Sequence, residues 1–540
     1  MPMTLPTPAQ VGAVPLGRSR YAIPDGARYV SPTGDDAADG TISRPWRTVA
    51  RGAAVCPPNG TLVLRSGKHP VEAVQLYNKA LAIQAHPGEV VWFTGSDIVT
   101  GWVAAGTAWV KRGWTQRFVA ALPDPALLDP AYPAAGHPEQ VYINDVAQTQ
   151  VLSRDQLRPG CFWLDETRSE LWLGSSPSGR TVEVSVRKSA LVYQQAGCAG
   201  SKVRGVGFRH YSTEYGQVGA VRVAATSDIT FENCHFDGAS FSGAFVQTST
   251  GIRIVRNTFR RCGQLGLRAF KAPELTVEAN VFEENNTGHF SGGGAAGGMK
   301  VDTNCDHARI RWNLVRDNVG AGLWVDVYSS NATIVGNVVE RNTACGIFFE
   351  YSDGAVIAGN ITRDNNGIGI QMGEAANVEV WNNTLIDDGI SFYEGRRAAI
   401  AAGCRVRNNV ITIRSGAAVP FSTRDYNPTG IKPWDGLGWT QDSNAVYRRS
   451  STTASIFASH QSATVARTVY ANRGALRIIG QELNGLASDN TAVDPFLYVD
   501  DTPKAALACA GEPLPANVAA ALGLPAGEAP TIGAIQWRTP

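Results

Sequence analysis

The amino-acid sequence predicts an all-β fold, a right-handed parallel β-helix, and two repeating patterns carry this prediction. Short strand-like stretches of the form glycine, apolar, any, apolar, any recur and begin at Gly266, Gly298, Gly322, Gly346 and Gly369. Asparagines recur at steps of 23 to 25 residues with one step of 33, at Asn233, Asn257, Asn280, Asn313, Asn337, Asn360, Asn383 and Asn408. A fixed period with β-branched runs and no helical periodicity is typical of one β unit stacked on itself.

The repeat also predicts which side chains lie together. The asparagines are expected to stack as a ladder at an inward bend, because each side-chain amide can bond to the amide of the next coil. The apolar residues that follow the glycines are expected to form one inner column of Leu267, Met299, Leu323, Ile347 and Ile370. A β-sandwich would show irregular strand spacing and hairpin signals instead.

The pattern divides the chain into five segments. A Pro- and Ala-rich start reads as an attachment arm, and a proline cluster between residues 123 and 138 breaks the period, which indicates a small inserted β subdomain. The expected segments are the arm at 1–26, the start of the β-helix with its N-terminal cap at 27–104, the inserted β subdomain at 105–187, the β-helix core at 188–413, and a long loop with a C-terminal cap at 414–540.

Composition excludes several classes of partner. The net charge of +1 gives no electrostatic case for nucleic acid or an anionic membrane, and no apolar run reaches membrane-spanning length. The nine cysteines are scattered without a Cys-x-x-Cys pair, so they are expected to be small buried packing residues.

Alignment of the glycine-anchored strands exposes a candidate active site. Alternate residues of a strand share a face, so the third and fifth positions of the pattern point away from the core. The fifth positions place Asp302, Asp326 and Glu350 in one outer column on successive coils, which we call the acidic column. Lys300, Trp324, Phe348 and Gln371 follow one another in the third-position column beside it.

Two chemistries fit this column. Carboxyls on adjacent coils, about 4.8 Å apart, suit a retaining glycosidase, whereas two coils of separation approach the inverting range. We expect substrate contacts from Lys300, Asp302, Trp324, Phe348 and Gln371, and from His289 in the glycine-rich insertion 288–298. A polysaccharide lyase is the alternative, with Lys300 as base and the acidic column holding Ca²⁺. The hydrolase needs no cofactor.

Two resemblances to known β-helix families add to this prediction. The segments from Tyr29 to Asp36 and from Arg44 to Val49 resemble the opening of pectate-lyase-like β-helix proteins, in which a short helix, here near 48–56, caps the first coil. The segment from Gly322 to Asp326, continued by Gly346 to Glu350, resembles the core of β-helix glycoside hydrolases of the β-xylosidase type. That resemblance implies Asp326 as nucleophile and Glu350 as acid/base. The residues after each acid, Val327 and Tyr351, differ from the family pattern.

A third resemblance concerns biological context. The segment from Thr7 to Pro15 is similar to one found in minor tail proteins of bacteriophages. It implies a tail-spike-like protein of the virion that binds and cleaves host-envelope polysaccharide, with other tail proteins as partners and a homotrimer as one form. A secreted protein is the alternative location. A non-catalytic protein that binds glycan through the acidic column is the third functional hypothesis.

Overall fold

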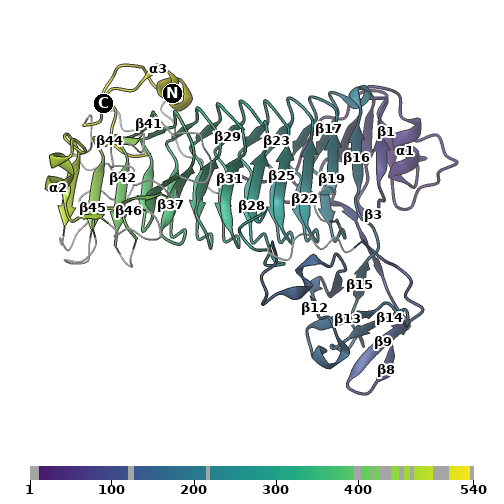
Figure 1. Ribbon diagram of the computed structural model, residues 1–540. Helices are drawn as coiled ribbons and strands as arrows, with labels where there is room; N and C mark the ends of the chain where they lie inside the picture. Colours follow the sequence, from purple (N-terminus) through teal and green to yellow (C-terminus); the bar gives the residue numbers. More distant parts are fainter. Residues whose placement is uncertain are drawn as a thin grey trace.

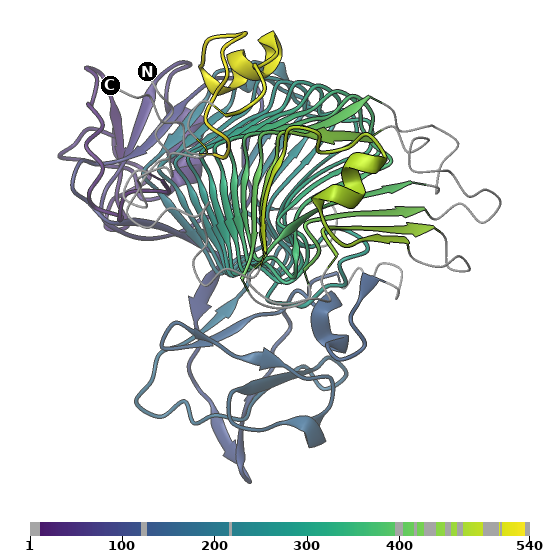
Figure 2. The ribbon, with the colours of Figure 1, turned by 90° about the vertical axis from the view of Figure 1, so that its left-hand side faces the viewer.

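The structure is a computed structural model, and it describes residues 11–119, 127–214, 219–394, 403–414, 418–425, 439–448, 455–461, 468–489, 507 and 510–534. Residues 1–10 of the predicted arm and much of the predicted C-terminal segment lie outside the described residues. The described chain forms a right-handed parallel β-helix with a small β lobe on one side (Figure 1). Viewed along its axis, the three walls of the solenoid enclose one core (Figure 2).

Three sheets of 13 described strands each build the solenoid. A regular coil gives each sheet one parallel strand, whereas β47 at the far end pairs antiparallel with β46. The first sheet contains β1 (Arg28–Val30), β2 (Thr61–Leu64), β5 (Ala82–Ala85), β17 (Lys202–Arg204), β20 (Thr230–Glu232), β23 (Arg253–Val255), β26 (Thr276–Glu278), β29 (Arg309–Arg311), β32 (Thr333–Val335), β35 (Val356–Ala358), β38 (Glu379–Trp381), β41 (Cys404–Arg407) and β44 (Trp439–Asp442). The second sheet contains β4 (Val74–Leu76), β16 (Leu191–Gln194), β19 (Gly219–Ala224), β22 (Ser242–Gln247), β25 (Leu265–Phe270), β28 (Gly297–Asp302), β31 (Ala321–Asp326), β34 (Ile347–Glu350), β37 (Ile368–Gly373), β40 (Gly389–Glu394), β43 (Phe421–Asp425), β46 (Phe457–Gln461) and β47 (Thr468–Tyr470). The third sheet contains β3 (Gly67–Pro70), β6 (Val91–Thr94), β18 (Gly207–Arg209), β21 (His235–Asp237), β24 (Thr258–Arg260), β27 (Val281–Glu283), β30 (Leu314–Arg316), β33 (Val338–Glu340), β36 (Ile361–Arg363), β39 (Thr384–Ile386), β42 (Val410–Ile413), β45 (Ala445–Arg448) and β48 (Leu486–Asp489).

The predicted inner column of the second sheet is confirmed. In register, β25, β28, β31, β34 and β37 stack Leu267, Met299, Leu323, Ile347 and Ile370, each no more than 1% exposed. They belong to one continuous apolar core that runs the length of the solenoid. Burial of this column supplies the main driving force for stacking, at about 25 cal/mol per Å² of apolar surface.

An asparagine ladder lies at the corner between the first and third sheets. Each backbone N–H and each side-chain amide donates to the Oδ1 atom one coil on, at 2.8–3.1 Å, along Asn257, Asn280, Asn313, Asn337, Asn360, Asn383, Asn409 and Asn444. The ladder was predicted, but two of its members were wrong. Cys234 and Asn409 occupy the ladder positions, while Asn233 and Asn408 lie one residue earlier and bond to the N-terminal and C-terminal segments.

A second ladder, which the period of the sequence did not reveal, lies between the third and second sheets. It runs through Asn285, Asn318, Asn342 and Asn365 and ends on Asp388. At both corners the residue before the ladder side chain is left-handed, as in Arg256 and Trp312 at the first corner and Asp317 at the second. Such a conformation costs a non-glycine residue about 1–2 kcal/mol, which the buried hydrogen bonds of the ladder offset.

Each ladder ends on a carboxylate, and this gives the stability of the fold a pH dependence. Glu482 accepts from the backbone and side-chain amides of Asn444, and burial raises its pKa to about 7 against the lowering effect of those hydrogen bonds. A carboxyl whose folded pKa exceeds its unfolded pKa stabilises the fold fully below the unfolded value, and this contribution is lost as the pH rises through about 7.

We therefore expect Glu482→Gln to flatten the dependence of unfolding free energy on pH. In the parent, the contribution of Glu482 to the unfolding free energy should fall by up to about 3 kcal/mol between pH 4.5 and pH 8, since one pKa unit corresponds to about 1.4 kcal/mol. Urea unfolding at pH 5 and pH 8 measures the difference, and Glu528→Gln, at an exposed position, is the matched control. An identical pH slope in parent and Glu482→Gln would contradict the assignment.

The described part of the predicted arm is a strap along the corner of the first and third sheets. Gly12 N–H donates to Ala279 O at 2.7 Å, and Ala13 N–H donates to Thr258 Oγ1 at 3.1 Å. Farther along, Val14 O contacts His235 Nε2 at 2.9 Å, and Ala22 O accepts from Gln84 at 3.1 Å. Residues 11–22 therefore run back along the solenoid toward its first coil, and this part of the arm is not a free extension.

Two small sheets form the lobe beneath the solenoid in Figure 1. The first contains β11 (Val146–Ala147), β10 (Val141–Ile143), β15 (Val182–Ser185) and β7 (Ser96–Ile98). The second contains β12 (Thr149–Gln150), β13 (Cys161–Asp165), β14 (Glu170–Leu173), β9 (Ala108–Arg112) and β8 (Val103–Ala105). The lobe thus begins with β7, earlier than the expected start at 105, because β7 already pairs with β15 instead of continuing the coil.

The ends of the solenoid are covered, and its regular coils extend past the expected end at 413. Helix α1 (Val49–Val55), with Thr48 as its N-cap, covers the first coil, and β44, β45 and β46 continue the three sheets. Helix α2 (Arg473–Ile478) lies at the far end, and helix α3 (Ala516–Leu522) packs on the first sheet. Short 3₁₀ helices in the described part of the chain include η3 (Pro133–Gly136), η4 (Arg154–Gln156) and η5 (Ala196–Cys198). Among the described residues no helix has the length and apolarity needed to span a bilayer.

The cysteines pack in the interior, as expected. The eight that the structure describes are all free and buried. Burial raises the pKa of the thiols of Cys234 and Cys262 to about 12, so these side chains act as small apolar groups.

Candidate active site

The acidic column lies on the outer face of the second sheet, at the carboxyl ends of three neighbouring strands. Asp302 ends β28, Asp326 ends β31 and Glu350 ends β34. Asp302 and Asp326 are direct register partners, and the pairing of Val325 with Phe349 brings Glu350 to the next place. The three carboxyls therefore follow one another at strand spacing, about 4.8 Å per coil.

The three acids are buried, although they point away from the apolar core of the solenoid. Asp302, Asp326 and Glu350 are each only 5–6% exposed, and Lys300 and Trp324 beside them are 7% and 5% exposed. Charges at such positions interact far more strongly than charges in water. Each of them therefore needs a partner, and the partners define the site.

Lys300 is the partner of Asp326. Its ammonium lies 2.8 Å from Asp326 Oδ2 and 3.4 Å from the centre of the Trp324 ring, and it donates to Gly294 O at 3.0 Å. The other carboxylate oxygen, Asp326 Oδ1, accepts from the backbone N–H of Val327 at 2.7 Å. These contacts fix the Asp326 carboxyl group in one orientation.

Arg268, one coil before Lys300, is the partner of Asp302. Its Nε atom lies 3.5 Å from Asp302 Oδ2. Burial raises the pKa of Asp302, the neighbouring Asp326 carboxylate adds to the rise, and Arg268 and Lys300 oppose it. Asp302 and Asp326 therefore lie in different electrostatic environments, with Arg268 beside the first and Lys300 beside the second.

Tyr393 is a partner of Glu350 that the sequence reasoning missed. It lies on β40, and its hydroxyl hydrogen bonds with Glu350 Oε1. The signal was present, because the stretch from Gly389 to Tyr393 continues the glycine, apolar, any, apolar, any pattern by one further coil. In register, Tyr393 pairs with Gly373, which in turn pairs with Glu350.

The third-position column forms an aromatic strip beside the acids. Trp324 stacks on Phe348, with ring centres 5.1 Å apart and planes at 22°, and Gln371 follows Phe348 in register. Trp324 Nε1 is buried without a hydrogen-bond partner among the described residues. A buried donor of this kind is costly unless a bound polar group satisfies it.

His289 lies in the loop that contains the glycine-rich insertion 288–298. No described contact joins its side chain to the acidic column. Its ring stacks on Tyr132 of the lobe, with ring centres 3.8 Å apart and planes at 6°. Leu128 of the lobe also forms an antiparallel bridge with Phe290 in this loop. Since the same loop supplies Gly294 O to Lys300, the loop and the lobe together form one wall beside the acidic column.

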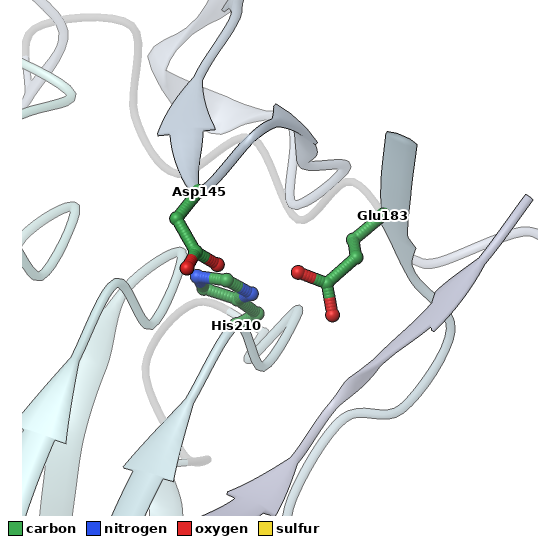
Figure 3. Close-up of side chains that lie close together, drawn as sticks. All are labelled: Asp145, Glu183 and His210. Carbon is green, nitrogen blue, oxygen red and sulfur yellow. The ribbon is translucent and has the colours of Figure 1, made fainter. Parts of the chain in front are cut away.

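A second cluster of ligand-type side chains lies where the lobe joins the solenoid. Asp145, Glu183 and His210 approach within 4.8 Å of one another, and the two carboxylates face the His210 ring from different sides (Figure 3). Lys68 lies 3.0 Å from Glu183, and Arg209 lies 3.2 Å from Asp145 and 3.6 Å from Glu183. Burial lowers the pKa of His210 to about 3, and its ring stacks on Tyr142.

Through these contacts the cluster attaches the lobe to the solenoid. Two cations already neutralise its two carboxylates, so a metal ion there would have to displace an ion pair at a mostly buried position. The neutral imidazole packs between the lobe and the third sheet. The residues were invisible as a group in the sequence, because they come from three segments that only the fold brings together.

Comparison with known proteins agrees with this architecture. A family model described as right handed beta helix region matches residues 219–385 and 325–432. No curated protein matches the sequence. The structure of XylC, solved as a complex with xylose, superposes with a TM-score of 0.69 at 15% identity over 87% of this chain and 87% of that chain.

Two further solved structures have lower scores. A glycoside hydrolase gives a TM-score of 0.49 at 12% identity over 85% of this chain and 99% of that one. Pectate lyase Pel9A gives 0.42 at 14% identity over 95% of this chain and 97% of that one. At 15% identity the likeness to XylC is one of fold. The stacked sheets, the family match and this likeness together identify the chain as a right-handed parallel β-helix.

Proposed function

We propose that the protein is a retaining glycoside hydrolase that acts on a polysaccharide or cell-envelope glycan, with Asp326 as nucleophile and Glu350 as acid/base. One observation carries this proposal. Two buried carboxyls lie at the same outer register position on adjacent strands, and each is held by a different partner, Lys300 for Asp326 and Tyr393 for Glu350. Adjacent-strand spacing of about 4.8 Å approaches the 5–5.5 Å separation of retaining enzymes.

The proposed reaction has two steps. Asp326 Oδ attacks the anomeric carbon while Glu350 gives its proton to the glycosidic oxygen, so the sugar–oxygen bond breaks and a glycosyl ester forms. Glu350, now a carboxylate, then takes a proton from water, which attacks the ester and releases the sugar with retained configuration. Lys300 and the N–H of Val327 keep the Asp326 carboxylate aimed outward before the first step.

The neighbouring side chains support the binding of a sugar. Phe348, the half-buried member of the aromatic strip, offers an apolar surface to a sugar ring, and the indole N–H of Trp324 lacks a hydrogen-bond partner among the described residues. Asp302 lies one coil from Asp326, where it would orient a sugar hydroxyl, with Gln371 at the opposite end of the strip. We assign His289 to the wall formed by the loop and the lobe, away from the reacting atoms.

The ion pairs weaken the lyase alternative. A lyase base needs a free lone pair, and an ammonium 2.8 Å from Asp326 has none to offer. Likewise, Arg268 and Lys300 already supply positive charge to Asp302 and Asp326, which reduces the attraction of this column for Ca²⁺.

A leaving-group series tests the assignment of Glu350. We expect Glu350→Ala to lower kcat/KM by about 10²–10⁴-fold on phenyl glycosides, which need a general acid. The loss should be small on 2,4-dinitrophenyl glycosides, whose leaving group departs without a proton. Azide should accelerate the variant and yield a glycosyl azide of retained configuration. Aryl xylosides are the first substrates to try, because XylC was solved with xylose.

Two results would contradict the proposal. If Glu350→Ala keeps the activity of the parent on phenyl glycosides, Glu350 is not the acid. If the parent binds an envelope glycan but cleaves no member of a broad panel of glycans, the protein is not a hydrolase, and the acidic column serves only to bind glycan. Release of an unsaturated uronide, detected by its absorbance, would favour the lyase.

The biological setting remains a separate proposal. A tail-spike-like role in a virion rests on the resemblance of residues 7–15, of which residues 7–10 lie outside the described chain. The matches reported above do not bear on tail partners, on a trimer or on location. Electron microscopy of purified virions labelled with an antibody to this protein tests the location directly.

A further inference from the structure

Tyr393 and Gly373 form a pair whose geometry suggests a specific task at the proposed active site. Glu350, Gly373 and Tyr393 occupy the same register position on β34, β37 and β40. Glu350 and Tyr393 are thus two coils apart, about 9.6 Å between their backbones. Their side chains nevertheless meet, since the Tyr393 hydroxyl hydrogen bonds with Glu350 Oε1.

The absence of a side chain at residue 373 makes this contact possible. A Cβ atom at Gly373 would overlap Cζ, Cε1 and the hydroxyl oxygen of Tyr393. The Tyr393 ring therefore lies across the place where the intervening coil would otherwise project its side chain. Gly373 is not among the residues with positive φ, so space and not backbone conformation is what glycine provides here.

We infer that Tyr393 is a positioning residue for the acid/base Glu350, and that Gly373 is the opening through which it reaches that carboxyl. The inference rests on the proposed function. A phenol suits the task because its hydroxyl can accept a hydrogen bond from a carboxylic acid and donate one to a carboxylate. Tyr393 can therefore stay bonded to Glu350 when the carboxyl gives up its proton in the first step and regains it in the second.

The rest of the column fits this assignment. Tyr393 is 5% exposed and its ring lies 6.2 Å from that of Phe348, so it is packed against the aromatic strip. Its hydroxyl would hold the Glu350 carboxyl from the C-terminal side of the column, while Asp326 lies on the N-terminal side. Glu350 is thereby fixed between its positioning residue and the nucleophile.

The test combines Tyr393→Phe with the leaving-group series. Tyr393→Phe keeps the ring and removes only the hydroxyl, and we expect roughly a tenfold loss of kcat/KM on phenyl glycosides with little loss on 2,4-dinitrophenyl glycosides. The alkaline limb of the pH profile should move to higher pH, because the ionised Glu350 loses a hydrogen-bond donor. A purely structural role for Tyr393 would lower the rate on both substrates equally and leave the limb in place.

Gly373→Ala provides an independent variant. The new methyl group should push the Tyr393 ring away from Glu350, so it should reproduce the leaving-group pattern and the pH shift of Tyr393→Phe. In the double variant the two effects should not add, because both break the same contact. Tyr29→Phe, in β1 far from the column, is the matched control and should behave as the parent.

The outcomes separate the inference from the proposed function. If Glu350→Ala shows the general-acid pattern while Tyr393→Phe matches the parent in both readouts, the inference is overturned and the proposed function stands. If Glu350→Ala itself lacks that pattern, both are overturned. Circular dichroism and the unfolding midpoint of each variant show whether a lost activity comes from misfolding.

Discussion

Asp326→Asn is expected to lower kcat/KM by on the order of 10⁴-fold or more, because an amide oxygen cannot form the glycosyl ester. Asparagine is the better substitution because it keeps the shape of the side chain and one acceptor oxygen, which can serve Lys300 or the N–H of Val327 but not both at once. Alanine would remove both and leave the 7% exposed ammonium of Lys300 without its nearest carboxylate, at a cost of several kcal/mol. Steady-state kinetics on aryl glycosides, with the unfolding midpoint alongside, measure the effect.

The neighbouring acids provide the comparison for this variant. Asp302→Asn should lose less, about 10- to 100-fold, because Asp302 is assigned to substrate orientation. Asp364→Asn, at an exposed turn, should leave the activity unchanged. If Asp326→Asn turns over like the parent while Asp302→Asn is inactive, Asp302 is the second catalytic carboxyl and acts as a general base on the attacking water. Its distance of two coils from Glu350 would then predict an inverting enzyme.

Asn337→Ala is expected to cost about 3 kcal/mol or more of unfolding free energy. The Asn337 side chain accepts from the backbone and side-chain amides of Asn313 and donates to Ile310 O and to Asn360 Oδ1. Asn337 is fully buried, so its removal leaves several polar groups without partners, and each such group costs about 1–3 kcal/mol. Urea unfolding followed by circular dichroism gives the value.

A surface asparagine of the same solenoid is the control. Asn78 is exposed, does not have a positive φ, and makes no side-chain hydrogen bond among the described contacts, so Asn78→Ala should change the unfolding free energy by less than about 0.5 kcal/mol. Equal effects of the two substitutions would mean that the ladder contributes no more than a surface contact.

The sequence was sufficient to predict the core of the solenoid. The glycine-anchored pattern recurs in five successive strands of the second sheet, so Leu267, Met299 and Leu323 could be aligned without any structure, and their stacking followed from the two-residue period of a strand. The members of the asparagine ladder were harder to predict. At Asn382-Asn383 and Asn408-Asn409 two asparagines adjoin, and only the left-handed conformation of the first decides that the second turns inward.

The residues of the candidate site could be predicted from the sequence, but their burial and their ion pairs could not. Register arithmetic placed Asp302, Asp326 and Glu350 together, since all three share one strand position. Their burial depends on neighbouring long side chains and on the loop and lobe, which the repeat does not encode. For the same reason the ion pairs of Lys300 and Arg268 came only from the structure, and Tyr393 required one more coil of alignment.

The strap at the N-terminus has a consequence for the order in which the molecule is made. Gly12 bonds to Ala279, so a residue that is translated before the first coil binds a coil that is synthesised more than 260 residues later. Domains assemble from the N-terminus during translation. The strap must therefore remain unplaced while five coils grow beneath it, and it can close only when the coil of β26 has formed. Gly12, although it is translated before every coil, therefore reaches its native position only after about half of the solenoid has formed.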